Sequence, residues 1–109
     1  GGRLFLLLGL LIIVIGAPLS EETVFRGFLQ PALAQSRLGF WGASVVTTLA
    51  WAALHIQYSI YGLAEIVAVG LALSWVLKRT GSLWATMAIH GLYNGAQLVG
   101  TALRLFPWT

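Results

Sequence analysis

The run LFLLLGLLIIVIGAPL, residues 4–19, is apolar and uncharged, and it decides the expected fold. Its length approaches the ~20 residues that an α-helix needs to cross a bilayer. Three further apolar runs follow, at residues 40–58, 61–77 and 82 to about 106. We therefore expect an all-α fold, a polytopic transmembrane helical bundle with about four spans.

The composition supports a membrane protein. Hydrophobic residues make up 59% of the 109 residues and charged residues 8%, whereas a soluble domain carries roughly 25% charged residues. The apolar runs are too long for the strands of a membrane barrel, so helices are expected. The net charge of +3 is typical of loops that face anionic headgroups. We thus expect the lipid bilayer as a partner and no nucleic acid.

The length leaves room for one domain, residues 1–109. The chain begins Gly1, Gly2, Arg3 without an initiator Met, which we interpret as a fragment of a longer multi-span protein. Arg3 before an apolar run resembles a signal peptide, but the cleavage pattern is poor and more apolar runs follow, so a first span is the better interpretation. We expect a multi-pass protein of the prokaryotic plasma membrane.

The segment between the first two spans, residues 21–38, mixes apolar and polar residues. Pro18 lacks an amide proton and Ser20 is a good N-cap, which predicts that a new helix begins at Glu21. This motif-bearing helix should be partly buried or lie at the membrane interface. Pro31 is expected to kink or divide it, and Gly39 and residues 78–81 are expected to form turns.

The stretch EETVFR, residues 21–26, gathers three of the nine charged residues in one window. Glu22 and Arg26 are four residues apart, the favourable order for an ion pair on one helix face, whereas Glu21 points about 100° away. This predicts that Glu22 and Arg26 form a structural clamp and that Glu21 faces a cavity and acts on water. The alternative is that both carboxylates are solvated and stabilised by the helix dipole.

Both histidines lie inside predicted spans, where ionisable groups are costly and are candidates for function. His55 follows Trp51 by four residues, and His90 and Asn94 are also four apart, so each pair shares a helix face. A histidine that only packs is the alternative at His55. At His90 and Asn94 the alternative is polar contact between helices, which the neighbouring glycines would allow to approach closely.

Together these candidates supply one free carboxylate, two imidazoles and one carboxamide. Hydrolysis of an amide by water needs a base, which Glu or His can provide, and donors at the developing oxyanion, which His and Asn can provide. No Ser/His/Asp arrangement stands out, and the HExxH zinc signature is absent. Hydrolysis through a Glu-activated water is the simplest chemistry that these groups support.

These motifs resemble those of the CPBP intramembrane proteases, which include the CAAX prenyl proteases and bacteriocin-processing or immunity proteins of the Abi type. The EExxxR motif matches Glu21, Glu22 and Arg26; an aromatic residue followed by three residues and His matches Trp51 and His55; and HxxxN matches His90 and Asn94. The resemblance implies an intramembrane endopeptidase in which Glu21 and His55 activate water and His90 and Asn94 stabilise the oxyanion.

One departure from the family pattern is Trp51, where the family usually has Phe. We expect the larger ring to alter the size of the pocket without touching the chemistry. The substrate implied is a membrane-associated peptide or protein, either prenylated or a leader peptide.

A divalent metal remains an alternative, because Glu21, His55 and His90 could form a zinc site with an open position. Asn94 is an uncommon zinc ligand and a natural oxyanion donor, which favours a mechanism that requires no cofactor.

Two functions of other classes stay open. The same fold could serve a non-catalytic membrane scaffold or a bacteriocin-immunity protein that acts by binding. Transport of a lipid or small solute is less favoured, and Glu65 in the third span is the residue that would support it. Its alternative role is a hydrogen bond between helices.

The predicted topology contains a difficulty. Strict alternation of four spans would put Glu21 near one membrane face and His55 near the other, at ~1.5 Å rise per residue. We therefore expect that residues 21–38 enter the bilayer, or that the second span starts outside it, so that Glu21, His55 and His90 converge.

Overall fold

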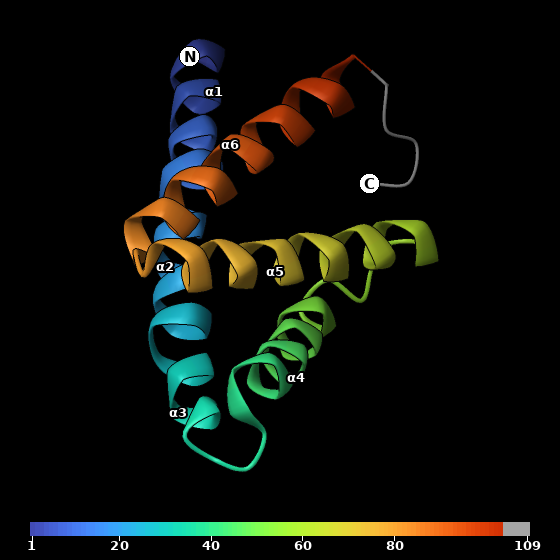
Figure 1. The fold of residues 1–109 in the computed structure, drawn as a ribbon. Coiled ribbons are helices and arrows are strands. Elements are labelled where there is room, and N and C mark those ends of the chain that lie inside the picture. Colours follow the sequence, from blue (N-terminus) through green and yellow to red (C-terminus); the bar gives the residue numbers. More distant parts are fainter. Residues whose placement is uncertain (104–109) are drawn as a thin grey trace.

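The computed structural model describes residues 1–103, and in that part of the chain it contains helices and no strand (Figure 1). The predicted all-helical class is confirmed. The elements in chain order are α1 (Gly2–Leu11), the π-helical turn η1 (Ile12–Gly16), α2 (Ala17–Val24), the π-helical turn η2 (Phe25–Leu29), α3 (Gln30–Ala34), α4 (Gly39–Ala53), α5 (Ile60–Thr80) and α6 (Leu83–Ala102).

The first five elements join end to end into one helix, Gly2–Ala34, of 33 residues. The prediction of a separate motif-bearing helix that begins at Glu21 is therefore wrong. Ser20 is not an N-cap, since its hydroxyl donates to the carbonyl of Gly16 at 3.0 Å within the continuing helix. The motif-bearing segment is the second half of this helix, which extends beyond the predicted span of residues 4–19.

The two π-helical turns explain why the prolines do not break this helix. Each turn ends two residues before a proline, η1 before Pro18 and η2 before Pro31. In the wider turn the amide of Ala17 bonds to the carbonyl of Ile12, five residues back. We attribute the continuity to this register, which relieves the clash between a proline ring and the carbonyl that precedes it by four residues. Pro31 accordingly does not divide the helix.

Helix α6 packs closely against the turn η1. Gly91 lies so near this turn that a Cβ atom added there would be 2.5 Å from the carbonyl oxygen of Val14. Val14 precedes Pro18 by four residues, so its carbonyl cannot take the usual helical bond from that proline. A glycine is thus required where α6 crosses the π-helical turn.

The later helices begin and end at residues with clear local causes. The hydroxyl of Ser59 accepts a hydrogen bond from the amide of Gly62 at the start of α5, and Ser82 caps α6 in the same way. Helix α5 ends at Thr80 and is followed by Gly81, whose φ of +63° suits glycine, and Gly39, the first residue of α4, has a φ of +66°. The turn predicted at residues 78–81 is wrong for residues 78–80, which continue α5, and is confined to Gly81; the turn predicted at Gly39 lies just before it, at residues 35–38.

Two helices of the described chain are long and apolar enough to cross a membrane, Gly2–Ala34 and Ile60–Thr80. Helix α4 has 15 residues, which span ~22 Å against the ~30 Å thickness of the hydrocarbon core. The second predicted span is therefore shorter than expected. The fourth predicted span begins as α6, and its expected end near residue 106 lies outside the described residues.

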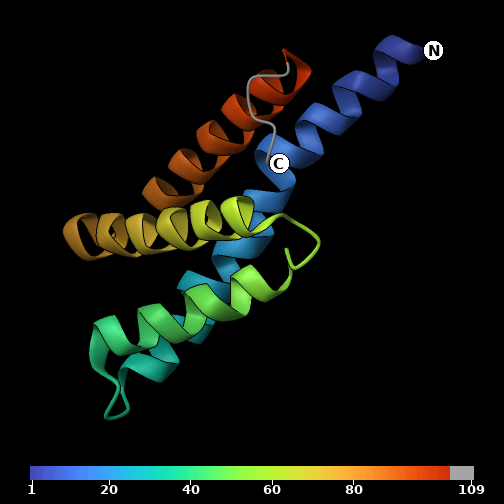
Figure 2. The same ribbon diagram turned by 90° about the vertical axis from the view of Figure 1, so that its right-hand side faces the viewer.

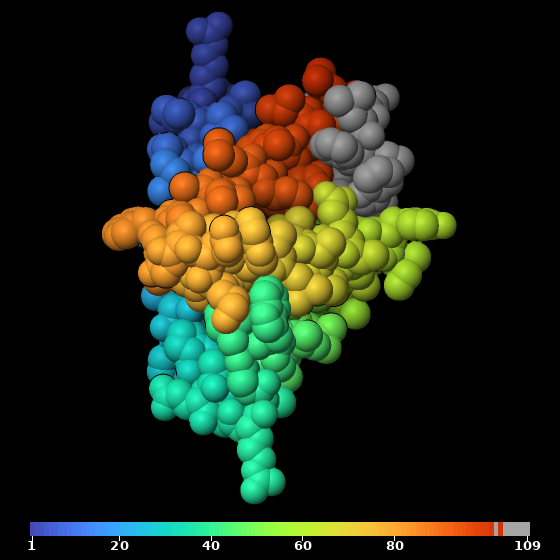
Figure 3. All heavy atoms as spheres, viewed as in Figure 1, coloured from blue at the N-terminus to red at the C-terminus, as the bar shows by residue number. Residues whose placement is uncertain are grey.

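Helix α5 lies between α6 and α4 in both ribbon views and crosses the long helix steeply (Figures 1 and 2). The N-terminal part of the long helix projects beyond the rest of the molecule (Figure 3). Its side chains from Leu4 to Ile12 are large, apolar and mostly exposed, whereas the fully buried side chains of the interior include many polar ones. This distribution suits a protein whose surroundings are apolar.

Exchange of Gly91 for alanine tests the close crossing of α6 and η1. We expect Gly91→Ala to lower the free energy of unfolding by about 1–3 kcal/mol, because the added methyl group overpacks against the Val14 carbonyl. The measurement is denaturant unfolding in detergent. Gly95→Ala is the matched control, since its Cβ would meet its nearest neighbour at an ordinary 3.7 Å, and it should not destabilise the protein.

Candidate active site

The residues predicted to be catalytic line one pocket. The pocket has a volume of about 390 Å³ and lies between the long helix, α5, α6 and the end of α4. Glu21, His55, His90 and Asn94 all contribute to its wall, together with Trp51. The chain thus brings together side chains that are up to 73 positions apart, from Glu21 to Asn94.

The position of His55 resolves the expected difficulty with topology. His55 does not lie within a spanning helix as predicted, because α4 ends at Ala53 and residues 54–57 form turns. Glu21 lies well inside the long helix instead of at its start. The two side chains therefore meet at the same pocket.

A buried carboxylate holds the site together. Oε2 of Glu22 accepts hydrogen bonds from Nη1 of Arg26 at 3.1 Å and from Nδ1 of His90 at 2.8 Å. The side chains of Glu22 and Arg26 are fully buried, and that of His90 is 2% exposed. The predicted ion pair within the helix is present, and His90 is a further partner, 68 residues away, that the spacing of the motif could not indicate.

Arg26 extends this contact to the other helices. Its Nη2 donates to the backbone carbonyl of Gly70 on α5 at 3.0 Å, and its guanidinium lies 5.0 Å from the ring centroid of Trp51 on α4. A Cβ atom at Gly70 would be 3.0 Å from Arg26 Nη2 and 2.6 Å from the Thr48 side chain. Glycine at this position allows the guanidinium to reach the carbonyl.

Trp51 contacts three of the four candidate catalytic side chains. Its indole N–H donates to Oε1 of Glu21 at 2.5 Å, and its ring packs edge-on against the rings of His55 and His90, each at 5.3 Å between centroids. The expectation that Trp51 would affect only the size of the pocket is wrong. A phenylalanine could not donate this hydrogen bond, so the departure from the family pattern reaches the proposed base itself.

The hydrogen bonds of the two histidines define which ring nitrogen carries a proton. Nδ1 of His55 lies 3.0 Å from the backbone carbonyl of Trp51. A carbonyl can only accept, so this nitrogen is the protonated one, and Nε2 of a neutral His55 is free to accept a proton. Nδ1 of His90 is likewise protonated, because it bonds to the carboxylate of Glu22.

Asn94 makes a contact between helices. Its Nδ2 donates to the backbone carbonyl of Ile13 in η1 at 2.9 Å. In the register of the π-helical turn this carbonyl would bond to the amide of Pro18, which has no proton. The amide nitrogen of Asn94 carries two N–H groups, and this bond uses one of them.

Within residues 1–103, no three His, Cys, Asp or Glu side chains lie together in a way that could hold a metal ion. Glu21, His55 and His90, the set considered for zinc, do not form such a group. Glu21 is engaged by Trp51 and His90 by Glu22 instead.

The pocket extends beyond the motifs along α6. Tyr93 and Gln97 line it and both donate hydrogen bonds to Glu65 on α5. The alternative role considered for Glu65, a hydrogen bond between helices, is confirmed. Gln97 follows Asn94 by three residues and His90 by seven, so a helical stripe drawn through the HxxxN motif would have found it, whereas the contact with Glu65 depends on how α5 and α6 pack.

Apolar helices around a pocket lined by a carboxylate, two imidazoles and a carboxamide define a helical membrane protein with the groups of a hydrolase. Comparison with known families agrees. Residues 3–96 match the family described as type II CAAX prenyl endopeptidase Rce1-like, and the chain belongs to that family. It is a family of membrane-associated proteases.

One relative is an uncharacterized 24.3 kDa protein of Escherichia coli, 39% identical over 87 residues. The aligned region covers 77% of this chain and 40% of that protein, so the chain spans well under half the length of its relative. No solved structure matches the chain.

Exchange of Glu22 for glutamine tests whether the buried carboxylate holds the fold. We expect Glu22→Gln to lower the free energy of unfolding by about 3–5 kcal/mol, because the guanidinium of Arg26 would remain buried without its counter-ion. Unfolding in detergent measures this. Glu21→Gln is the matched control: glutamine can still accept from the Trp51 indole, so its stability should stay close to that of the unmodified chain, and equal losses in both variants would contradict the assignment.

Proposed function

We propose that this chain is the catalytic core of an intramembrane endopeptidase that hydrolyses a peptide bond in a membrane-associated substrate. The observation that carries the proposal is that Glu21, His55, His90 and Asn94, which match the family's motifs, line one pocket. These groups can supply both needs of amide hydrolysis by water, a base and donors to the oxyanion.

In this proposal Glu21 is the base. It is half-buried and reaches the pocket, while the indole of Trp51 holds one of its oxygens. Water bound between Glu21 and Nε2 of His55 loses a proton to Glu21, and its oxygen attacks the carbonyl carbon of the substrate. When the C–N bond breaks, the proton passes to the nitrogen of the leaving amine.

His90 and Asn94 would stabilise the tetrahedral intermediate. Since Nδ1 of His90 bonds to Glu22, donation from Nε2 requires the imidazolium form, for which Glu22 is the counter-ion. Asn94 would donate with the N–H that does not bond to Ile13. No step in this mechanism passes through a metal ion.

The family and the surroundings of the site support a proposal for the substrate class. A prenylated peptide is favoured by the family's description as a CAAX prenyl endopeptidase, and a leader peptide is the second candidate. The two long apolar helices support a membrane protein, and we propose that it is a multi-pass protein of a prokaryotic plasma membrane.

A second candidate function is a non-catalytic membrane scaffold or immunity protein. The observation that favours it is the bond from Asn94 to the Ile13 carbonyl, because a residue that joins helices needs no catalytic role. The two candidate functions predict different effects of substitutions at Glu21 and Asn94.

Glu21→Gln should abolish turnover, because an amide cannot take the proton of water at neutral pH, while the fold is retained. The measurement is cleavage of a peptide library by the purified protein in liposomes, read by mass spectrometry. Thr23→Ala on the same helix is the control, since the Thr23 hydroxyl is exposed and bonds only to its own helix. A Glu21→Gln protein as active as the unmodified chain would remove Glu21 as the base.

Asn94→Ala should reduce the turnover rate by roughly 10²- to 10³-fold with little change in substrate affinity, the effect of losing one oxyanion donor. If Asn94 only joins helices, the change should cost about 0.6 kcal/mol of stability and leave activity per folded molecule intact. Turnover and unfolding are measured on one preparation. Gly95→Ala, the next residue on α6, is the control.

A further inference from the structure

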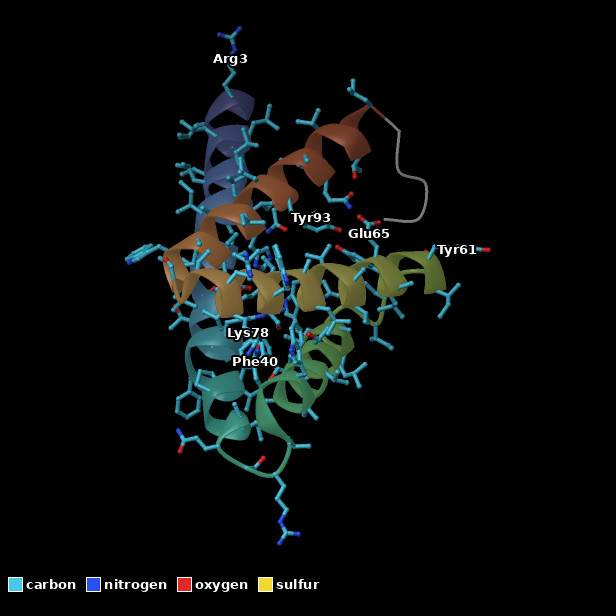
Figure 4. All side chains as sticks on the ribbon, viewed as in Figure 1. Arg3, Phe40, Tyr61, Glu65, Lys78 and Tyr93 are labelled. Atoms are coloured by element: carbon cyan, nitrogen blue, oxygen red, sulfur yellow. The ribbon has the colours of Figure 1, made fainter. Side chains whose placement is uncertain are left out.

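A second hydrogen-bonded cluster lies beside the pocket, between α5 and α6. Tyr93 Oη donates to Oε1 of Glu65 at 2.6 Å. Nε2 of Gln97 donates to the same carboxylate oxygen and also to Tyr93 Oη, the latter at 2.8 Å. Figure 4 shows Glu65 and Tyr93 in the space between the two helices. The proposed mechanism uses none of these three residues, although Tyr93 and Gln97 line the pocket.

Tyr93 and Gln97 use all the protons of their polar groups within this cluster. A tyrosine hydroxyl has one proton, which Tyr93 gives to Glu65, and a primary amide has two, which Gln97 gives to Glu65 and Tyr93. Gln97 is left with Oε1, which is buried and accepts no hydrogen bond from the described residues. Seven buried side-chain nitrogen and oxygen atoms of the described residues lack a hydrogen-bond partner, and Gln97 is the one residue among them that lines the pocket. Glu65 therefore fixes the amide of Gln97 so that its unused group is an acceptor.

The position of Gln97 suits a contact with the substrate. Gln97 is seven residues from His90 and three from Asn94 on α6, which corresponds to ~10.5 Å and ~4.5 Å along the helix. An extended peptide advances ~3.3 Å per residue, so a chain that follows α6 from these two groups reaches Gln97 within about three residues of the bond that is cleaved. An extended peptide in a pocket presents unpaired backbone N–H groups, which need acceptors.

We propose that Gln97 is a specificity residue of this site, whose Oε1 accepts a hydrogen bond from a backbone N–H of the substrate within about three residues of the cleaved bond. Glu65 and Tyr93 are positioning residues that hold the amide in this orientation. The inference rests on the proposed peptide substrate. Because the contact is with the backbone, the subsite accepts many side chains and rejects proline, which has no N–H.

The test uses binding, so that it does not depend on cleavage. The probe is a fluorescent farnesylated peptide of the Cys-aliphatic-aliphatic-X pattern that the family description implies, with three analogues that are each N-methylated at one backbone nitrogen. Affinities are measured by anisotropy on the whole chain in nanodiscs, in a Glu21→Gln background that prevents turnover. One analogue should bind about 2- to 12-fold more weakly than the parent peptide, as expected for the loss of one hydrogen bond.

In the same background, Gln97→Met should weaken binding of the parent peptide by that factor and remove the difference between the parent and the sensitive analogue. A merely structural role for Gln97 would not remove that difference. Glu65→Leu should have the same effect, because the amide is no longer held, and Glu65→Gln should restore discrimination, because glutamine still accepts from Tyr93 and Gln97. Unfolding in detergent checks that each variant folds.

Absence of peptide binding overturns the inference, and so does equal binding of all four peptides by the chain with Gln97 intact. The same conclusion follows if Gln97→Met retains the discrimination. The N-methyl series on the chain with Gln97 intact decides the question even if Gln97→Met fails to fold. Discrimination by N-methylation without cleavage by the unmodified chain would overturn the proposed protease and leave the peptide subsite standing.

Discussion

The arrangement of the helices depends on one buried carboxylate, that of Glu22. A charge removed from water is costly unless it is paired and hydrogen-bonded, and Glu22 Oε2 meets this condition with Arg26 from its own helix and His90 from α6. Arg26 in turn bonds to the Gly70 carbonyl of α5 and lies against Trp51 of α4. Through these contacts one carboxylate and one guanidinium join all the helices of the described chain at one point, and the pocket lies beside that point.

The two adjacent glutamates differ in burial, and the roles expected of them differ accordingly. Glu22 is fully buried, and its contacts orient His90, whereas Glu21 is half-exposed and faces the pocket. Trp51 links the two glutamates: its indole N–H donates to Glu21, and its ring lies against Arg26, the ion-pair partner of Glu22. A pocket carboxylate held by a buried neighbour is in position before a substrate binds, which is the pre-organisation that the proposed catalysis would need.

The prolines of the long helix have a consequence for the site. The π-helical turn before Pro18 leaves the Ile13 carbonyl without a helical donor, and Asn94 supplies one. The same crossing needs Gly91, whose missing side chain lets α6 approach the Val14 carbonyl. The carbonyl that the long helix leaves without a donor is therefore bonded by another helix, and this contact holds the middle of α6, which carries the HxxxN motif, against the long helix.

What depends on neighbours along the chain could be predicted from the sequence alone. The helical class follows from the apolar runs, the Glu22–Arg26 pair follows from a spacing of four residues, and the turn at Gly81 follows from glycine after a basic pair. The sequence also indicated which polar side chains were candidates, because ionisable groups are rare in apolar segments. Only the tertiary structure decided the bonds from His90 to Glu22 and from Trp51 to Glu21, and the contact with Glu65 that leaves an acceptor at Gln97. Local hydrogen bonds and helical spacing are set by residues within one or two turns, whereas these contacts join residues 30 to 68 positions apart and exist only once the helices have packed.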